Sequence, residues 1–424
     1  MMDAEVLKQV IFEQREARTA TGTTIERDAF PQAALDAPEA LIISGIRRCG
    51  KSTLLRQIRE RREEKDFYLN FDDERLVRFS VDDFQKLHEI FIELFGEQHS
   101  FYFDEIQNVE GWERFVRRLV DAGEKVFIAG SNASMLSREL GTHLTGRFVR
   151  HELFPFSFAE FLRLRGSEPK RSAAGTLNVR TTAARGALKQ ELGEYLRLGG
   201  IPQYVASGND DFLKLLYESI VYRDVLVRNK FSNERELLEL ALFLASNAAK
   251  RFSYVSLAKA VGLKDSGTAQ AYVCALENAY LVSQVRKFDF SVKKQIANTK
   301  KIYFADPALI RKIGFNATRN EGPIFENVVF NELQRRGNEI FYHAGKHECD
   351  FVLRRGTEIT DAIQASVSLA DAETREREIA GLLDALTAYN LGEGTIITFD
   401  EESEFSESGK TVRVRPLWKW LLGA

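Results

Sequence analysis

The sequence predicts an α/β protein whose first folded region is a parallel sheet with helices on both faces. Short apolar, β-rich runs at 40–44, 67–71, 100–105 and 125–130 alternate with charged stretches that have helical patterning. Strands that alternate with helices in this way form a parallel sheet that is buried on both faces. The chain has 424 residues, which is long enough for several domains.

The rhythm of the sequence changes along the chain and predicts five segments. Residues 165–190 contain few large apolar residues and many small and basic ones, which is typical of a mobile loop or insertion. The expected segments are a helical lead-in (1–39), the parallel-sheet core (40–164), a flexible insertion with helices (165–230), a helix-turn-helix region (231–320) and a small α/β domain (321–424).

Composition excludes several classes of protein. With 44% hydrophobic and 29% charged residues, and no run of about 18 apolar residues, we expect a soluble, cytoplasmic protein with no membrane partner. Cys49, Cys274 and Cys349 have no paired spacing, which argues against a disulfide framework or a zinc site. The formal net charge of -3 argues against a wholly basic nucleic-acid coat protein, although local basic patches can still bind nucleic acid.

The stretch "GIRRCGKST" matches the phosphate-loop pattern G-x-x-x-x-G-K-[ST]. An apolar run precedes it and a helical run follows it, as this chemistry requires, because the loop N–H groups and the helix N-terminus then face the phosphates. Lys51 would reach the β- and γ-phosphates of ATP, and the hydroxyl of Ser52 would bind Mg²⁺. The expected nucleotide-binding residues are Gly45, Ile46, Arg47, Arg48, Cys49, Gly50, Lys51, Ser52 and Thr53.

Two later strands end in polar residues that suit the same site. "SFYFDEIQ" leads an apolar run into Asp104, which would hold Mg²⁺ through water, and Glu105, which would polarise the water that attacks the γ-phosphate. "KVFIAGSNAS" leads another run into Ser131 and Asn132, which could contact the γ-phosphate or orient the water. Gly-Ser-Asn is also ordinary turn chemistry, so this second element is the weaker one.

Several stretches together resemble the AAA+ ATPases of archaea and bacteria whose phosphate loop reads G-x-R-R-x-G-K. They are "GIRRCGKST", "FYFDEIQ" with "GWERFVRRL", "AGSNAS", "LTGRF" with "ELFPFSFAEF", and "LGGIPQYV". The resemblance extends over nearly the whole chain, because such proteins usually follow the ATPase core with a winged helix and a nuclease-like domain. It implies a P-loop AAA+ core, a helical lid, a winged helix and a small α/β domain like a restriction endonuclease.

The resemblance also implies two further site residues. Arg147 matches a candidate arginine finger, which would reach the nucleotide of a neighbouring subunit in a homo-oligomer; Arg138 and Arg150 are nearby alternatives, and a structural arginine is an equal one. Pro202 resembles the lid proline that packs against the base in related signal-transducing ATPases. The alternative for Pro202 is a simple turn, because Gly-Gly-Ile-Pro is strong turn chemistry.

Residues 231–320 read as a helix-turn-helix followed by two strands, the pattern of a winged helix. Ser266, Thr268 and Gln270 at the start of the recognition helix would face a DNA groove. The alternative is a protein-packing module, because this helix contains few basic residues. A local basic cluster would add phosphate contacts from the wing: Arg286, Lys287, Lys293, Lys294, Lys300 and Lys301.

The last hundred residues resemble the PD-(D/E)XK nuclease fold, in which a helix Glu, a strand Asp and an E-x-K strand hold magnesium. Glu326 and Asp350 match the first two elements, but Gln364 stands where the acid belongs and Ser366 where the lysine belongs. Without that lysine no group steadies the developing negative charge, so we expect little or no nuclease activity. Candidates for a migrated cation are Lys346, Arg375 and Arg377.

These observations predict an ATP hydrolase that requires Mg²⁺ and drives or regulates a DNA-associated process. One alternative is a slow nucleotide-dependent switch that binds a protein partner. Another is an ATP-gated nuclease, against which Gln364 and Ser366 are the evidence.

Overall fold

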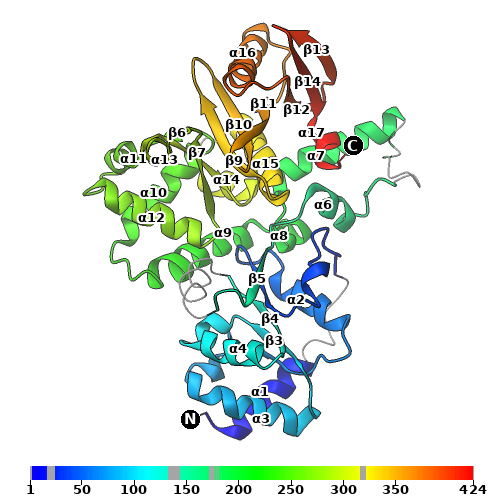
Figure 1. Cartoon of the computed structure of the whole chain (residues 1–424), viewed down its shortest axis with the longest axis vertical. Coiled ribbons are helices and arrows are strands. Elements are labelled where there is room, and N and C mark those ends of the chain that lie inside the picture. Colours follow the sequence, from blue (N-terminus) through cyan, green and yellow to red (C-terminus); the bar gives the residue numbers. More distant parts are fainter. Residues whose placement is uncertain are drawn as a thin grey trace. The chain divides into compact units, whose positions relative to one another are not determined.

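The structure is a computed structural model that describes residues 2–16, 24–131, 144–170, 177, 179, 181–315 and 321–423 (Figure 1). It divides into two compact units. The N-terminal unit comprises Met1–Phe154 and Asn278–Tyr280, and the C-terminal unit comprises Pro155–Glu277 and Leu281–Ala424. The division between Phe154 and Pro155 lies inside the segment expected to be the ATPase core (40–164).

The N-terminal unit is built on a parallel sheet, as the sequence predicts. In the described part of the chain five strands have the order β2-β3-β4-β1-β5, and every pair of neighbours is parallel. Strands β1 and β3 are buried along their whole length, because they are apolar on both faces. The strands are β1 (Ala40–Ser44), β2 (Tyr68–Asn70), β3 (Ser100–Asp104), β4 (Lys125–Ala129) and β5 (Phe148–Glu152).

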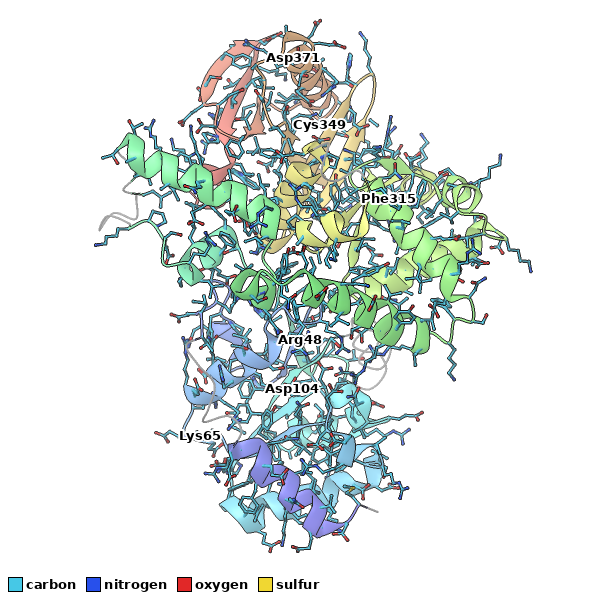
Figure 2. The ribbon with its side chains drawn as sticks, turned by 180° about the vertical axis from the view of Figure 1, so that it is seen from behind. Arg48, Lys65, Asp104, Phe315, Cys349 and Asp371 are labelled. Carbon is cyan, nitrogen blue, oxygen red and sulfur yellow. The ribbon has the colours of Figure 1, made fainter. Side chains whose placement is uncertain are left out.

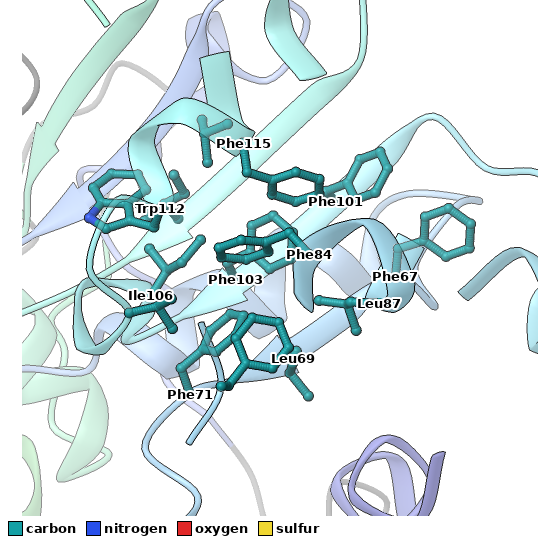
Figure 3. Packing of buried hydrophobic residues seen from close by; sticks show 14 of the residues in the cluster. Phe67, Leu69, Phe71, Phe84, Leu87, Phe101, Phe103, Ile106, Trp112 and Phe115 are labelled. Carbon is teal, nitrogen blue, oxygen red and sulfur yellow. The ribbon is translucent and has the colours of Figure 1, made fainter. Parts of the chain in front are cut away.

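Helices and a cluster of aromatic rings hold this sheet. The helices are α1 (Ala4–Glu16), α2 (Lys51–Glu60), α3 (Phe84–Phe95) and α4 (Trp112–Asp121). Phe84 of α3 stacks on Phe115 of α4 with 4.4 Å between ring centroids, and Phe103 of β3 packs beside Phe115 at 6.0 Å (Figure 3). The lead-in helix α1 also buries Leu7 and Val10, so it is part of this core. These contacts anchor β3, which carries the acidic pair at its end.

The C-terminal unit begins with helices. The expected loop over 165–190 is wrong in its last part, because α7 starts at Thr182 and Thr181 caps it by accepting the N–H of Ala184 at 3.2 Å. Residues 171–176, 178 and 180 lie outside the described residues. The first helices of this unit are α6 (Phe158–Leu164), α7 (Thr182–Leu198), α8 (Pro202–Ser207), α9 (Asp210–Ser219) with a π-helical continuation (Ile220–Val227), and α10 (Glu234–Ser246).

The next part of the C-terminal unit has the order helix, strand, helix, helix, strand, helix, strand. After α10 come β6 (Arg251–Phe252), α11 (Tyr254–Ala260), α12 (Ser266–Asn278), β7 (Val282–Lys287), α13 (Val292–Ala297) and β8 (Lys300–Phe304). Strands β7 and β8 form an antiparallel hairpin, and β6 pairs with β8. The link between the hairpin strands contains the short helix α13, which the alternating pattern did not predict.

The remaining elements complete one large sheet. They are α14 (Pro307–Ile313), α15 (Gly322–Arg335), β9 (Glu339–Ala344), β10 (Glu348–Arg355), β11 (Glu358–Ala365), α16 (Ala372–Ala388), β12 (Glu393–Thr398), β13 (Ser403–Glu407), β14 (Lys410–Pro416) and α17 (Leu417–Leu421). Among the described residues, nine strands have the order β13-β14-β12-β11-β10-β9-β7-β8-β6. Because β7 pairs with β9 in parallel, this sheet crosses the boundary expected between residues 320 and 321.

Candidate functional site

The phosphate loop joins β1 to α2 in the N-terminal unit. Gly45 has φ of 145° and Gly50 has φ of 103°, backbone angles that glycine adopts far more readily than other residues. A Cβ at Gly45 would lie 2.2 Å from the carbonyl oxygen of Leu153, so no larger residue fits there. Arg48, labelled in Figure 2, is exposed and also has a positive φ, of 65°. The loop therefore has the wrapped backbone that its sequence predicts.

Lys51 lies folded across this loop. Its side chain is buried, and its Nζ donates to the carbonyl oxygens of Gly45 at 3.0 Å and Ile46 at 2.9 Å. Ser52, the next residue, is exposed in the first turn of α2. An ammonium bound only to neutral carbonyls can exchange them for phosphate oxygens at small cost, because charge-assisted hydrogen bonds are the stronger ones.

A residue of the lead-in that sequence reasoning missed braces the loop. The guanidinium of Arg27, buried at 6% exposure, donates to the carbonyl oxygens of Cys49 at 2.9 Å and Phe154 at 2.6 Å. The thiol of Cys49 lies 3.3 Å from the oxygen of Leu153, and burial raises its pKa. Cys49 therefore contributes backbone rather than side chain to the loop surface.

The acidic pair stands at the end of β3. Asp104, labelled in Figure 2, is the buried last residue of that strand. Glu105 follows it with φ of 51°, a left-handed conformation that is uncommon outside glycine, and its N–H donates to the oxygen of Ala129 at 2.8 Å. Gln107 Nε2 donates to the Glu105 carboxylate, and Ser131 Oγ lies 3.4 Å from the same oxygen.

The sheet order brings these groups to one edge. Strand β4 lies between β1 and β3, and its residue Ala129 is paired with both Ile43 and Asp104. In parallel strands the carboxyl ends share an edge, so the phosphate loop, the acidic pair and Ser131 follow neighbouring strand ends. Asn132, the other expected γ-phosphate contact, lies outside the described residues.

The arginine candidates differ in their surroundings. Arg147 precedes β5, and its carbonyl accepts the N–H of Ala40 at the start of β1, which is the sheet edge opposite the phosphate loop. Its Nε donates to Asp121 at 2.5 Å, so Arg147 cannot serve the nucleotide site of its own chain. Arg150 instead donates to Ser44 Oγ at 3.0 Å and to the Tyr280 hydroxyl at 2.5 Å. Arg138 lies outside the described residues.

Pro202 is the first residue of α8 in the C-terminal unit. The two glycines before it are held by Asp306, whose Oδ2 accepts the N–H of Gly200 at 2.6 Å. A Cβ at Gly199 would meet Asp306 Oδ1 at 1.8 Å. Burial raises the pKa of Asp306 to about 7. The Gly-Gly-Ile-Pro stretch is thus a tightly built turn, and the contact of Pro202 with a nucleotide base stays a prediction.

The second group of expected site residues meets in the C-terminal unit around a lysine. The Nζ of Lys301 lies 2.9 Å from Glu326, 2.8 Å from Glu348 and 2.9 Å from Asp350. Burial lowers the pKa of Lys301, but the nearby carboxylates, Asp350 first, outweigh this and hold it well above its usual value. Burial, followed by the charge of Asp350, raises the pKa of Glu326, while Lys301 acts in the opposite direction and favours its carboxylate form.

Local structure explains why these side chains meet. Asn327 on α15 extends the hydrogen bonding of β8, because its side-chain amide accepts from the N–H of Phe304 and donates to the Phe304 oxygen, both at 2.8 Å. This pair sets Glu326 against β8. On β10, the register against β9 shifts between Cys349 and Val352, and such bulges commonly re-aim a side chain, here that of Asp350.

The structure corrects two expectations about the lysines assigned to the expected wing. Lys300 and Lys301 do not face solvent, since Lys301 lies in the carboxylate cluster. Lys300 Nζ donates to the oxygens of Ile296 and Asn298 and is also buried. The pairing of β7 with β9 joins the hairpin to the C-terminal strands that surround Lys301, whereas Lys300 is covered by the link that precedes β8 and by Tyr254. The adjacent lysines on an apolar strand were the only sequence signal for this arrangement.

Comparison with known proteins places the chain in a family. Residues 37–162 match the family described as "AAA domain", and residues 189–319 match a "Domain of unknown function (DUF8612)". "Uncharacterized protein MJ1544" of Methanocaldococcus jannaschii is 32% identical over 90% of this chain and 88% of its own length. The chain belongs to the MJ1544 family. Another relative, an "Uncharacterized protein" of Haemophilus influenzae, is 31% identical over 75% of this chain and 80% of its own.

Two solved structures show a weak similarity to this member of the MJ1544 family, with low sequence identity and low TM-scores. A Signal Transduction ATPase with Numerous Domains protein, PH0952 from Pyrococcus horikoshii, has a TM-score of 0.29 and 14% identity, covering 74% of this chain and 46% of that one. Cdc6p from Pyrobaculum aerophilum has a TM-score of 0.27 and 12% identity, covering 78% and 98%. The AAA match, together with the parallel sheet, confirms the expected P-loop AAA+ ATPase core.

Within the described residues no helix is long and apolar enough to cross a membrane. In the same part of the chain, no group of three or more His, Cys, Asp or Glu side chains is arranged to hold a metal ion.

The expected DNA-facing residues lie on two surfaces of the C-terminal unit. At the start of α12, Gln270 is exposed and Ser266 is half-buried. The N–H and the hydroxyl of Thr268 both donate to Asp265, at 2.9 and 3.2 Å, so Thr268 helps to cap the helix. On the hairpin and its link, Arg286, Lys293 and Lys294 are exposed and Lys287 is half-buried, beside the exposed apolar side chains of Phe290, Val292 and Ile296.

Proposed function

We propose that this protein hydrolyses ATP with Mg²⁺ and uses the nucleotide cycle to drive or regulate a DNA-associated process. The observation that carries the proposal is the edge of the N-terminal sheet. There the phosphate loop, Asp104, Glu105 and Ser131 follow the ends of three neighbouring strands. This is the set of groups that phosphoryl transfer from ATP to water requires.

Each group has a role that its position supports. Lys51 would leave the carbonyls of Gly45 and Ile46 to bind the β- and γ-phosphates, while the loop N–H groups hold the phosphate oxygens. The Ser52 hydroxyl and the Asp104 carboxylate are hard oxygen ligands of the kind that Mg²⁺ prefers. Bound there, Mg²⁺ would neutralise charge on the phosphates. Glu105 would polarise the attacking water.

The arrangement of the C-terminal unit supports DNA as the target. Support for the proposed winged helix comes from the order of elements from α10 to β8, in which two helices, α11 and α12, precede the antiparallel strands β7 and β8 that α13 links. The exposed Arg286, Lys293 and Lys294 supply the cations that phosphate contacts need, and α12 offers Gln270 to a groove. The exposed Asp265 at the start of α12 would repel phosphates, so we place the main contact on the wing.

The nuclease-like module would bind rather than cut. Lys346 is exposed, the guanidinium of Arg375 lies over the ring of Phe405, and Arg377 donates to Glu378. None of these three candidate cations has a described hydrogen bond or salt bridge with Asp350, although the charge of Asp350 acts on Arg377 across the cleft. Purified protein with Mg²⁺ should leave DNA intact. Cleavage that disappears in Asp350→Ala would contradict this.

Oligomerisation and location are part of the proposal. Arg147 sits at the sheet edge away from the loop of its own chain, with its side chain a third exposed, so an arginine finger at this position would have to act on a neighbouring copy. We therefore propose a homo-oligomer, acting in the cytoplasm.

A specific contact favours a second candidate, the slow nucleotide-dependent switch. Both Gln107 and Ser131 hold the Glu105 carboxylate, which competes with its action on water. The variant Gln107→Ala should raise the ATP turnover rate by about threefold if this contact restrains Glu105, a change of well under 1 kcal/mol in barrier. The exposed Gln85→Ala is a matched control that should leave the rate unchanged. An unchanged rate in Gln107→Ala would remove the support for the switch.

The central experiment is the ATPase rate with and without single-stranded, duplex and branched DNA. Strong acceleration by DNA supports the proposed function, whereas slow turnover that DNA does not affect, with tightly retained nucleotide, supports the switch. The variant Lys51→Ala is the control. If it hydrolysed ATP at the normal rate, the assignment of the loop would be wrong.

A further inference from the structure

A cleft of about 1120 Å³ opens in the C-terminal unit beside the carboxylate cluster. Its wall includes Lys301, Glu326, Asp350 and Gln364, which come from β8, α15, β10 and β11. Asp371, labelled in Figure 2, lines the same cleft at the start of α16. A nuclease of the expected fold would hold its divalent cation among these groups, so what occupies the space between the carboxylates decides what the cleft can do.

The ammonium of Lys301 occupies that space. It has three N–H donors, and three carboxylates lie within 2.9 Å of it, those of Glu326, Glu348 and Asp350. The Lys301 side chain is only 2% exposed, and those of Glu326 and Asp350 are 14% and 10% exposed. With three carboxylates for three donors, this lysine is not positioned to orient a water molecule or to support a phosphate.

The other side chains of the cluster are engaged as well. Gln364 Oε1 accepts the N–H of Asp350 at 3.1 Å, and its Nε2 donates to Glu378. The second oxygen of Asp350 accepts the N–H of Ala365 at 3.1 Å. Glu348 also pairs with Arg251 at 3.1 Å, and the Tyr303 hydroxyl donates to Glu326 at 2.6 Å. The carboxylates thus have the partners that buried charges need.

We infer that Lys301 is the resident cation of this cluster and takes the place of a divalent metal ion, so the wild-type cleft binds none. The inference rests on the proposed function only in treating this domain as nuclease-like. It deepens the proposal because it identifies the group that prevents metal-dependent cleavage. It also assigns a structural consequence: the ion pairs tie β8 of the hairpin to α15 and β10, so the wing and the C-terminal strands move as one body.

The test is divalent-cation binding by nucleotide-free protein. Electron paramagnetic resonance should detect no Asp350-dependent Mn²⁺ binding in the wild-type protein. Ca²⁺ should not raise the Tm of the wild-type protein. In Lys301→Met the carboxylates lose their counter-ion, so the Tm should fall. About 5 mM Ca²⁺ or Mn²⁺ should then raise it by roughly 5 °C, because a cation that binds only the folded state stabilises it.

Lys300→Met is the matched control. This neighbouring lysine is also buried but donates to carbonyl oxygens, so its loss should lower the Tm with no recovery on adding Ca²⁺. Mn²⁺ binding by wild type that disappears in Asp350→Asn would overturn the inference, as would a folded Lys301→Met protein that ignores divalent cations.

If Lys301→Met fails to fold, expression in medium with added Ca²⁺ and the comparison of wild type with Asp350→Asn decide the question. Recovery of soluble protein by Ca²⁺, or the absence of Asp350-dependent Mn²⁺ binding in wild type, supports the inference. None of these measurements depends on ATP hydrolysis, so the inference and the proposed function can fail separately.

Discussion

Two buried lysines, one in each unit, show how partners decide the role of a residue. Among the described residues, the partners of Lys51 in the phosphate loop are the neutral carbonyls of Gly45 and Ile46. Lys301 in the C-terminal unit lies among three carboxylates. The first arrangement is easily exchanged for an anionic ligand, whereas the second is already neutralised and resists exchange. Burial alone therefore does not identify a functional lysine.

The largest expected effect comes from breaking the cluster. Lys301→Met should lower the free energy of unfolding by about 3–5 kcal/mol, because it leaves buried carboxylates without a counter-ion. Lys300→Met should cost less, about 1–3 kcal/mol, because it loses two carbonyl contacts and a cation–π contact with Tyr254 but leaves no buried carboxylate without a counter-ion. Chemical denaturation of both variants measures the difference. Equal losses would show that the carboxylates do not distinguish the two sites.

Lys51→Ala removes the other buried lysine of the comparison, the one in the phosphate loop. It should reduce ATP turnover by at least about a hundredfold, or about 2.7 kcal/mol in barrier, because Lys51 would no longer neutralise the phosphates. Its effect on stability should be small beside that of Lys301→Met, and chemical denaturation checks this. If Lys51→Ala unfolded the protein while Lys301→Met did not, the assignment of Lys301 as the structural lysine and Lys51 as the exchangeable one would be wrong.

Exposed lysines provide a third environment for the same residue type. The double variant Lys293→Ala, Lys294→Ala should weaken DNA binding by about tenfold and reduce the slope of log affinity against log salt by about 2, because two phosphate contacts are lost. Fluorescence anisotropy at several salt concentrations measures both. Lys264→Ala with Lys259→Ala, exposed on the neighbouring helical segment, is a control of equal charge. An unchanged salt slope would remove the wing from the DNA contact.

The smallest expected effect is an opposite pH dependence of the two units. Burial lowers the pKa of His88 and His151 in the N-terminal unit and raises that of Glu152; with two histidines against one carboxyl group, its stability should rise with pH until the unfolded histidines lose their protons near 6.5. Burial raises the pKa of Asp306 to about 7, so the C-terminal unit binds an extra proton when folded. Its stability should fall by roughly 1 kcal/mol per pH unit between the unfolded and folded pKa values.

Pulse proteolysis between pH 5.5 and 7, with fragments assigned to each unit by mass spectrometry, tests this pH dependence. If both units changed stability in the same direction over this range, the contrast drawn from these buried groups would be wrong.

The wrapped backbone of the phosphate loop was predictable because its signals are local. "GIRRCGKST" sets its own backbone through Gly45 and Gly50, and the apolar runs around it form strands wherever both faces are covered. By contrast, the helix at Thr182 was missed because the number of small residues outweighed the capping signal of Thr181. Arg27 was missed because nothing in the sequence near it indicates the loop that it braces.

The charge cluster was only partly predictable. Glu326, Asp350 and Gln364 were expected together, yet Lys301 was assigned to DNA, because its place depends on which strand lies beside β7. That pairing joins residues 286–287 to residues 341–342, and no local sequence pattern around either pair indicates it.

Residue type and order were enough to predict the parallel sheet of the AAA core, the backbone of its phosphate loop and the position of Asp104 and Glu105 at the end of a buried strand, because each depends on contacts within or between adjacent elements. The tertiary structure decided which cation lies among the C-terminal carboxylates and which lysines of the expected wing reach solvent. It also decided which edge of the N-terminal sheet Arg147 occupies. These outcomes depend on long-range strand pairing and burial, and the low polarity of the interior then makes the electrostatic partners obligatory.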